Sequence, residues 1–257
     1  MNKLNDENLL FDEPTHVYSL KNDPEIEFTS ATTFIHHFFS PFDREKVAEK
    51  LLGLPKYAGK TKEDLFQDWK QSGISGTNVH GALEDIIIEH NAGEDVYDFE
   101  DVSKKHLENR CDNDFEYQKA YNGATWLRDN VLFEPELMLL PEVMVYSKEL
   151  KIAGMMDLLV KNTVTGNYTI LDWKTNKRIS KKAFGSAKGT QKATEEIDDC
   201  NYMHYTLQLS LYRYILETYY GLNISSQALI HLSNEKATVM KCEYLEDTIK
   251  NMLKEIK

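Results

Sequence analysis

Residues 154–177 read GMMDLLVKNTVTGNYTILDWKTNK, and this stretch decides the fold. Two apolar runs flank NTVTGN, a turn-forming sequence, so the stretch predicts two neighbouring strands joined by a tight turn. Each run carries one acid, Asp157 in the first and Asp172 in the second. An isolated carboxylate in an apolar strand is costly to bury unless a metal ion, a salt bridge or exposure at a sheet edge compensates it.

The positions of these acids predict a catalytic arrangement. Side chains alternate along a strand, so Asp172 and Lys174 share one face of the second strand. Antiparallel pairing can bring Asp157 next to Asp172, and a divalent cation would relieve the repulsion between the two carboxylates. Oxygen ligands favour Mg²⁺ or Mn²⁺ over zinc, and a nearby ammonium suits metal-assisted phosphodiester hydrolysis. The alternative is a chance D-x-K triplet on an exposed strand.

The surrounding sequence predicts an α/β fold, a mixed sheet flanked by helices. Strands are expected at 136–147, 151–162, 167–175, 227–233 and 237–244. A helix is expected from about 202 to 220, closed by Gly221, and a short helix from about 245 ends the chain.

The first half of the chain is expected to be helical. Residues 1–75 are predicted to form a lobe of short helices, and residues 76–257 the core domain. Apolar spacing makes 78–90 the clearest helix. A helical insertion is expected at about 94–135, beginning with a polar connection over 94–112.

Composition sets the class of protein. The chain has 257 residues, 41% hydrophobic and 28% charged, which fits one domain or one domain with an added lobe. No apolar run approaches the roughly 18 residues of a membrane span, and residues 1–14 lack a signal-peptide core, so a cytoplasmic location is expected. Cys111, Cys200 and Cys242 form no C-x-x-C pair, which predicts neither a thiolate zinc site nor an iron–sulfur cluster.

Charge is unevenly distributed along the chain. The net charge of −12 argues against a general nucleic-acid coat protein. Residues 173–194 nevertheless contain no Asp or Glu. They carry seven basic residues, Lys174, Lys177, Arg178, Lys181, Lys182, Lys188 and Lys192. Such a run is either a solvated loop or, because it begins at the D-x-K triplet, a contact for a polyanion beside the site.

Two helical pairs of polar residues could face the same site. His80 and Glu84 are four residues apart, so they lie on one helix face. They are either packing residues or a metal ligand with its partner. Gln208 and Tyr212 have the same spacing and are either a hydrogen-bonded packing pair or a pair directed at Lys174 or a substrate phosphate.

Four motifs in order carry a family resemblance: GTNVHGALE, GMMDLLV, ILDWKT and LQLSLY. They resemble the RecB-type branch of the PD-(D/E)xK nuclease superfamily, which has a restriction-endonuclease-like core. DWKTNK with the GTNVHGALE helix is similar to phage-encoded exonucleases and to the mitochondrial genome maintenance exonuclease. HVYSL and FTSATTFIHHFF also resemble the segment before the core in those proteins. Many relatives hold an iron–sulfur cluster with four cysteines, so this chain resembles the cluster-free members.

The resemblance implies a site for Mg²⁺ or Mn²⁺. Asp157 and Asp172 match the metal-binding acids of the family, and His80 matches the histidine that completes the metal shell. The Trp173 backbone carbonyl is a further expected ligand, and Glu84 is a weaker match. We therefore expect His80, Asp157 and Asp172 to converge on one metal position.

The resemblance also implies catalytic and DNA-binding residues. Lys174 matches the lysine that positions the attacking water and offsets charge in the transition state. Gln208 and Tyr212 match the Q-x-x-x-Y helix of the RecB branch, which is expected to contact nucleic acid. The basic residues expected beside them on the DNA are Lys177, Arg178, Lys181 and Lys182.

The resemblance implies a Mg²⁺-dependent deoxyribonuclease that degrades DNA from its ends. Single-stranded DNA is the favoured partner, in replication, recombination or repair, in a bacterial or phage-infected cell. No membrane partner is expected. Three alternatives stay open: a structure-specific or restriction-type endonuclease, a non-catalytic DNA-binding subunit with the same fold, and an acidic scaffold protein whose motif matches are accidental.

Overall fold

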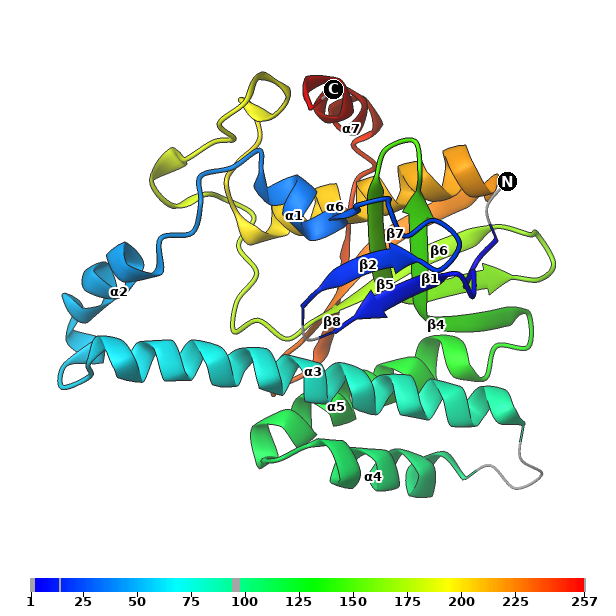
Figure 1. Cartoon of the computed structure of the whole chain (residues 1–257). Coiled ribbons are helices and arrows are strands. Elements are labelled where there is room, and N and C mark those ends of the chain that lie inside the picture. The colour runs from blue at the N-terminus through cyan, green and yellow to red at the C-terminus, as the bar shows by residue number, and fades with distance from the viewer. Residues whose placement is uncertain (1–2, 14, 94–97, 257) are drawn as a thin grey trace.

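The computed structural model describes residues 3–256 apart from 14 and 94–97. A mixed sheet of six strands forms its centre, in the order β3-β5-β6-β7-β8, with β4 also paired to β5 (Figure 1). The strands are β3 (Thr29–Ser30), β4 (Leu137–Ser147), β5 (Ile152–Asn162), β6 (Tyr168–Lys174), β7 (Ile224–Leu232) and β8 (Ala237–Lys241). The β3–β5 and β6–β7 pairs are parallel and the others antiparallel, so the predicted mixed α/β fold is confirmed.

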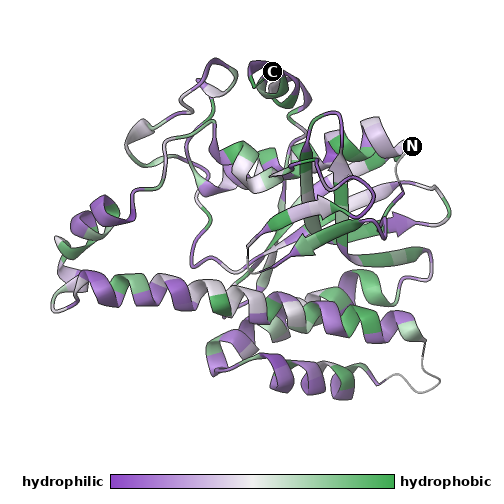
Figure 2. Cartoon of the chain, in the orientation of Figure 1, coloured by the Kyte–Doolittle hydropathy of each residue, from purple (hydrophilic) through white to green (hydrophobic). Residues whose placement is uncertain are grey.

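Helices cover both faces of this sheet. One face packs against α1 (Ala31–His36), α6 (Asn201–Ile215) and α7 (Glu246–Glu255). The other packs against α3 (Lys62–Ala92), α4 (Phe99–Arg110) and α5 (Asp114–Leu127). The remaining helical segments are α2 (Arg44–Leu52), the 3₁₀ turns η1 (Pro55–Tyr57), η3 (Phe184–Ser186) and η4 (Lys192–Thr194), and the π-turns η2 (Arg128–Leu132) and η5 (Leu216–Tyr220). Apolar residues gather on the strands and on the helix sides that face them (Figure 2).

The predicted strand pair lies in the middle of the sheet, and its register sets the site. β5 pairs with β6 from Leu158↔Leu171 to Lys161↔Tyr168, so continuing this register puts Asp157 opposite Asp172. Toward its N-terminal end, β5 leaves β6 and pairs with β3 instead. Within the described chain, residues 154–156 therefore pair with a strand only on the β4 side.

The N-terminal segment differs from the predicted helical lobe. β1 (Leu9–Asp12) and β2 (Val17–Leu20) form an antiparallel hairpin before α1 begins. Tyr18 and Leu20 are two residues apart in VYSL, so both reach the same side, where they pack near Tyr146. The prediction of short helices throughout this segment is wrong here because strand alternation and burial on the sheet outweigh helix propensity.

The helix predicted over 78–90 is part of a longer helix, α3, which begins inside the segment predicted as a separate lobe. A capping box between Thr61 and Asp64 begins α3, and Gly93 in the left-handed conformation ends it 31 residues later. Gly73 and Gly76 each lower helix stability by only about 1 kcal/mol relative to Ala, so they do not break the helix. The second half of α3 packs on the sheet, and the first half extends beyond it and carries α2 (Figure 1).

α4 occupies most of the segment expected as a polar connection, and residues 94–97 of that segment lie outside the described residues. Asp98 caps the helix by accepting hydrogen bonds from the backbone N–H groups of Glu100 and Asp101. Phe99 and Leu107 are buried among many charged neighbours. Two buried apolar residues are too few to form a visible helical pattern, so the prediction of a polar connection is wrong over the residues of α4.

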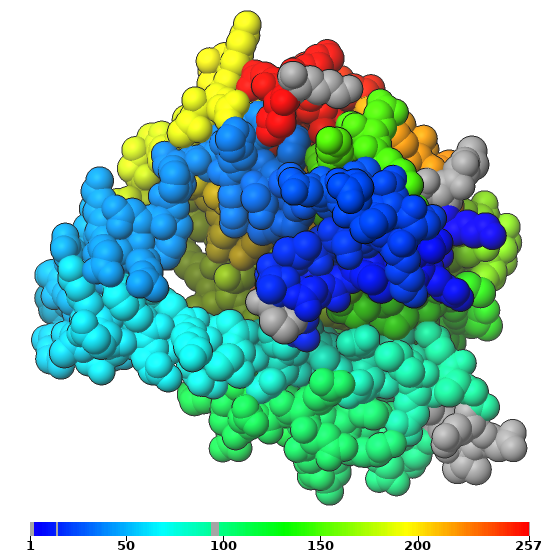
Figure 3. Space-filling view, viewed as in Figure 1, coloured from blue at the N-terminus to red at the C-terminus, as the bar shows by residue number. Residues whose placement is uncertain are grey.

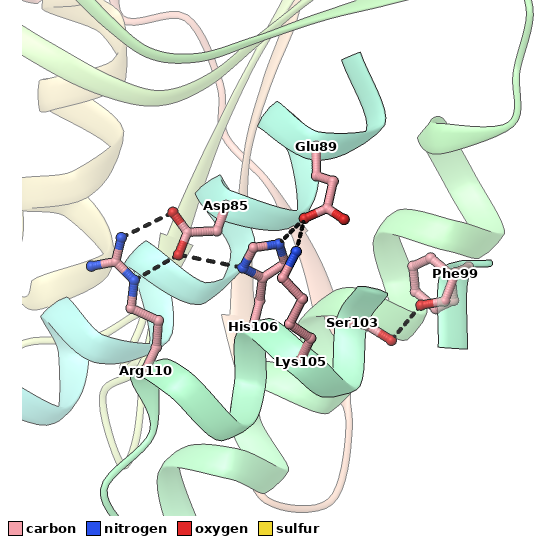
Figure 4. A network of polar contacts seen from close by, with 7 residues as sticks. All are labelled: Asp85, Glu89, Phe99, Ser103, Lys105, His106 and Arg110. Atoms are coloured by element: carbon pink, nitrogen blue, oxygen red, sulfur yellow. Dashed lines mark hydrogen bonds and ion pairs between the residues drawn. The ribbon is translucent and has the colours of Figure 1, made fainter. Parts of the chain in front are cut away.

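Polar contacts also hold α4 against α3 (Figure 4). Arg110 donates to both oxygens of Asp85, at 2.6 and 2.9 Å. The Nε2 atom of His106 lies 2.6 Å from Glu89, which also accepts a 2.7 Å hydrogen bond from Lys105. These contacts fix α4 along the half of α3 that packs on the sheet.

Candidate active site

Asp157, Asp172 and Lys174 meet where β5 leaves β6. Lys174 Nζ forms an ion pair with Asp172 Oδ2 and lies 4.6 Å from the centre of the Tyr205 ring. Asp157 Oδ2 accepts a 2.6 Å hydrogen bond from the Trp173 backbone N–H. The Asp157 carboxylate therefore occupies the edge of β6 at the point where the strand ladder with β5 has ended.

Helix α3 brings His80 to the same place. The Nδ1 atom of His80 lies 3.5 Å from Asp157 Oδ1. The helix can pass this close to the end of β6 because position 76 is glycine. A Cβ atom on Gly76 would lie 3.2 Å from Thr175 Oγ1, which is tighter than an ordinary contact. The first glycine of GTNVHGALE thus allows the histidine of that motif to reach β5.

Burial and mutual charge shift the pKa values of this group. Burial, together with the charge of Asp157, raises the pKa of Asp172 to about 6, although the Lys174 ammonium opposes this shift. Burial alone would also raise the pKa of Asp157, but His80, Lys174 and the Trp173 N–H hold it below its usual value. Burial disfavours the charged forms of His80 and Lys174, yet the neighbouring carboxylates raise both pKa values. The arrangement therefore stabilises an ionised Asp157 and leaves Asp172 the weaker acid of the two.

The donor atoms of this group, carboxylate oxygens and an imidazole nitrogen, suit a divalent cation. Asp172 is 3% exposed, and its Oδ2 atom is paired with the Lys174 ammonium. Among the described residues, no three His, Cys, Asp or Glu side chains are grouped to hold a metal ion. The expected convergence of His80, Asp157 and Asp172 on one position is therefore not found. Lys174 neutralises Asp172, and the Trp173 N–H donates to Asp157.

Gln208 and Tyr212 of α6 brace β5 close to Asp157. The Tyr212 ring is 2% exposed and packs on Gly154, where an added Cβ atom would lie 2.6 Å from its Cε1 atom. Gln208 Nε2 donates to the Tyr212 hydroxyl at 3.2 Å and to Thr32 Oγ1 at 3.0 Å. Tyr212 is thus the packing residue of the pair, and a direct contact between its ring and nucleic acid does not fit this burial. Gln208 is partly exposed and stays a candidate for such a contact.

A third carboxylate, which was not predicted from the sequence, faces Asp157 from β4. The β4–β5 register puts Glu142 opposite Asp157, so three acids lie in a row across β4, β5 and β6. Glu142 has a φ of 47°, which is uncommon for a residue other than glycine. Burial, with the charges of Asp157 and Glu84, raises its pKa to about 8. The sequence did carry a signal, since Glu142 interrupts the apolar run LLPEVMV as Asp157 interrupts GMMDLLV.

The side of the site toward the N-terminal hairpin is acidic. A pocket of about 500 Å³ lies there, and its lining includes Asp6, Glu7, Glu84 and Glu142. Burial and the charge of Asp85 raise the pKa of Glu84, while Arg110 opposes the shift. Glu84 therefore lies beside the row of carboxylates, on the flank where negative charge accumulates.

The basic segment leaves the site at the end of β6. Its predicted DNA-binding residues, Lys177, Arg178, Lys181 and Lys182, are all exposed. The segment is anchored, because the Thr190 N–H donates to the Phe38 carbonyl and Lys188 forms a 2.7 Å ion pair with Asp198. Lys188 is therefore an anchor of the segment, whereas the four predicted residues lie nearer the site along the chain.

A central mixed sheet with two aspartates and a lysine at a strand separation defines the core of an α/β nuclease. Residues 47–256 match the profile of the PD-(D/E)XK nuclease superfamily, so the chain belongs to this superfamily. Its members are nucleases that act on DNA and generally use divalent metal ions such as Mg²⁺ or Mn²⁺. A comparison with curated proteins gives no match. In the part of the chain that the structure describes, no helix has the length and apolar character needed to cross a membrane.

Proposed function

We propose that this protein is a metal-dependent exonuclease of the RecB-type branch that hydrolyses phosphodiester bonds from DNA ends. The observation that carries the proposal is the meeting of His80, Asp157, Asp172 and Lys174 where β5 leaves β6. Paired carboxylates beside a buried ammonium are the parts that metal-assisted hydrolysis of a phosphodiester requires.

In the proposed mechanism, His80, Asp157, Asp172 and the Trp173 carbonyl would hold Mg²⁺ or Mn²⁺. The bound ion would supply Lewis acidity, which activates water near neutral pH and stabilises the leaving oxygen. The Lys174 ammonium positions the attacking water and donates to the phosphate oxygen on which charge develops.

The charge distribution around the carboxylates supports action at ends. Acids on the side of the N-terminal hairpin, including Glu84 and Glu142, repel a phosphate chain. Exposed bases such as Lys181 and Lys182 lie on the segment between β6 and α6. This segment runs apart from the N-terminal hairpin (Figure 1). A strand would therefore be bound mainly on one side of the bond that is cut, as a terminal substrate is.

Single-stranded DNA is the substrate that we assign, and replication, recombination or repair is the process. Both assignments rest on the resemblance to phage-encoded exonucleases, as does a location in the cytoplasm of a bacterial or phage-infected cell. Glu84 is assigned a supporting role beside the metal ligands, because its carboxylate borders the same acidic pocket as Glu142.

The test compares linear and circular DNA in the presence of Mg²⁺. We expect 5′- or 3′-labelled linear single strands to be shortened from one end, while covalently closed circles, which have no ends, survive. Asp172→Asn is the inactive control. Cleavage of the circles would favour the structure-specific or restriction-type endonuclease, and binding without cleavage of any DNA would favour the non-catalytic subunit.

A further inference from the structure

A groove leads away from the active site to an exposed aromatic ring. It has a volume of about 1040 Å³, and its lining includes Phe39, Phe42, Lys46, Lys50, Asn201 and His204. We call this space the distal groove. A smaller pocket shares His36 and His204 with it and continues to Tyr205 and Gln208. The two adjoining spaces form a path that ends at Tyr205, whose ring lies 4.6 Å from Lys174 Nζ.

Figure 3 shows the entrance to this path as a hollow between the blue segment of α1 and α2 and the cyan helix α3. Olive and gold atoms, from the segment after β6 and from α6, form its floor. The hollow is bordered by the part of α3 that extends beyond the sheet, so it lies on the side of the molecule away from α4 and α5 (Figure 1).

The exposed ring in the distal groove is held in place from behind. Phe42 is 70% exposed, and its ring makes an edge contact with Trp69, at 5.7 Å between centroids. Trp69 in turn contacts Phe66, over which Arg44 lies at 4.7 Å. A large apolar ring that is exposed yet supported by neighbours loses little freedom when a flat ligand stacks on it.

The distal groove presents two lysines that can hold phosphates. In the described part of the chain, Lys46 and Lys50 form no ion pair, although both line the groove. Two acids also line the groove, and each contacts a neighbouring group. Asp43 caps α2 by accepting a 3.0 Å hydrogen bond from the backbone N–H of residue 46, and Asp199 lies 3.0 Å from His204 Nε2. An aromatic face beside unpaired lysines is the combination that binds single-stranded nucleic acid.

We propose that the distal groove binds single-stranded DNA away from the bond that is cut, with a base stacked on Phe42 and phosphates held by Lys46 and Lys50. This proposal rests on the proposed function for the identity of the polymer. Stacking on one ring requires an unpaired base, because both faces of a base inside a duplex are covered by its neighbours. The occupant is therefore the single strand and not the duplex.

The test measures binding without cleavage, in EDTA, by the anisotropy of fluorescein-labelled oligo(dT) of about 20 nucleotides, longer than one strand-binding site. Phe42→Ala should weaken binding about tenfold, the typical size of one base–aromatic stack, and Phe42→Trp should restore it. The matched control is Phe115→Ala, which removes a ring that is 73% exposed on α5. Affinity for a blunt duplex should be the same in all four proteins.

Salt dependence provides the second measurement. Lys46→Ala should reduce the slope of log affinity against log salt by about 0.7, the value for one phosphate contact on a single strand. Lys104→Ala, on the exposed surface of α4, is the control and should leave the slope unchanged. Unchanged oligo(dT) binding by Phe42→Ala, or an equal reduction in duplex binding, would overturn the proposal.

Cleavage with Mg²⁺ separates this proposal from the proposed function. If the parent protein cuts DNA and Phe42→Ala binds oligo(dT) as tightly as the parent, the proposal for the distal groove is wrong and the proposed exonuclease function is supported. If oligo(dT) binding depends on Phe42 but no DNA is cut, the proposal for the groove is supported and the proposed nuclease function is wrong. Where both hold, Phe42→Ala should raise KM and leave kcat unchanged.

Discussion

Replacing Gly154 by alanine tests whether the contact between β5 and α6 controls the position of Asp157. Gly154 lies three residues before Asp157 on β5, beside the buried ring of Tyr212. An added Cβ atom would lie 2.6 Å from Cε1 and 2.9 Å from the hydroxyl oxygen of Tyr212. Favourable contacts between carbon atoms are at about 3.5–4.0 Å, so the ring and the strand must separate by about 1 Å.

The structure limits how this overlap can be relieved. Tyr212 is 2% exposed, and its hydroxyl accepts a hydrogen bond from Gln208, so the ring cannot swing into solvent. Overpacking of this kind costs about 1–3 kcal/mol of stability. β5 is the other element that can move, and it carries Asp157. A displacement of about 1 Å at a catalytic group can lower the rate about 10²-fold.

Urea unfolding and DNA cleavage measure the two effects, and Gly73→Ala is the matched control. Gly73 lies in α3 with nothing within 4 Å of an added Cβ atom, so alanine there should stabilise the protein by up to about 1 kcal/mol. Its cleavage rate should match the parent. If Gly154→Ala unfolds at the parent's urea concentration, the packing argument is refuted. If it is less stable but cleaves at the parent's rate, Tyr212 does not position Asp157.

The remaining predictions concern the site, the helical layer and the basic segment. Asp172→Asn should lower both the affinity for Mn²⁺ and the rate of cleavage. Lys174→Ala should keep Mn²⁺ binding in calorimetry but lower the single-turnover cleavage rate about 10²-fold. If Lys174→Ala cleaves at the parent's rate, Lys174 has no part in the mechanism. Glu116 is 1% exposed and accepts four hydrogen bonds. Burial raises its pKa, but these hydrogen bonds outweigh burial and hold the pKa of Glu116 below its usual value. Glu116→Gln should therefore destabilise the protein by about 2 kcal/mol at pH 7. A lowered pKa stabilises the fold above the unfolded value of about 4.3, so the difference in urea unfolding should shrink as pH falls below it, and a difference independent of pH would contradict this. Replacing Lys181 and Lys182 by alanine should reduce the salt slope of single-strand binding by about 0.7 for each phosphate that the variant no longer binds, and an unchanged slope would make the segment a solvated loop.

Much of the second half of the chain could be predicted because its structure follows local patterns. The alternation around Asp157 and Asp172, with a turn between the two strands, predicts the antiparallel pair whose register places these acids opposite each other. Helical spacing likewise predicts that Gln208 and Tyr212 lie one turn apart, as their hydrogen bond requires. These features depend on neighbours within about twenty residues, which the sequence displays directly.

Features that depend on distant segments could not be predicted in the same way. Tyr18 forms part of a strand because it packs against the sheet near Tyr146, a contact between residues far apart in the chain. Lys188 looked available for DNA, but its partner Asp198 lies just beyond the acid-free stretch. A binding role for Phe42 could not be predicted from the sequence, because it depends on the contact with the Trp69 ring and on the groove that Phe42 lines.

The separation of β5 from β6 explains how the chain tolerates two aspartates so close together. In a continuous ladder, the edge of β6 at Trp173 would face the backbone of β5. Here the Trp173 N–H bonds to the Asp157 carboxylate, and the same gap admits His80 from α3. Asp157 is thereby paired on two sides, whereas Asp172 depends on Lys174 and has the higher pKa. Asp172 is thus the carboxylate whose ionised form depends most on a neighbouring positive charge, which Lys174 supplies.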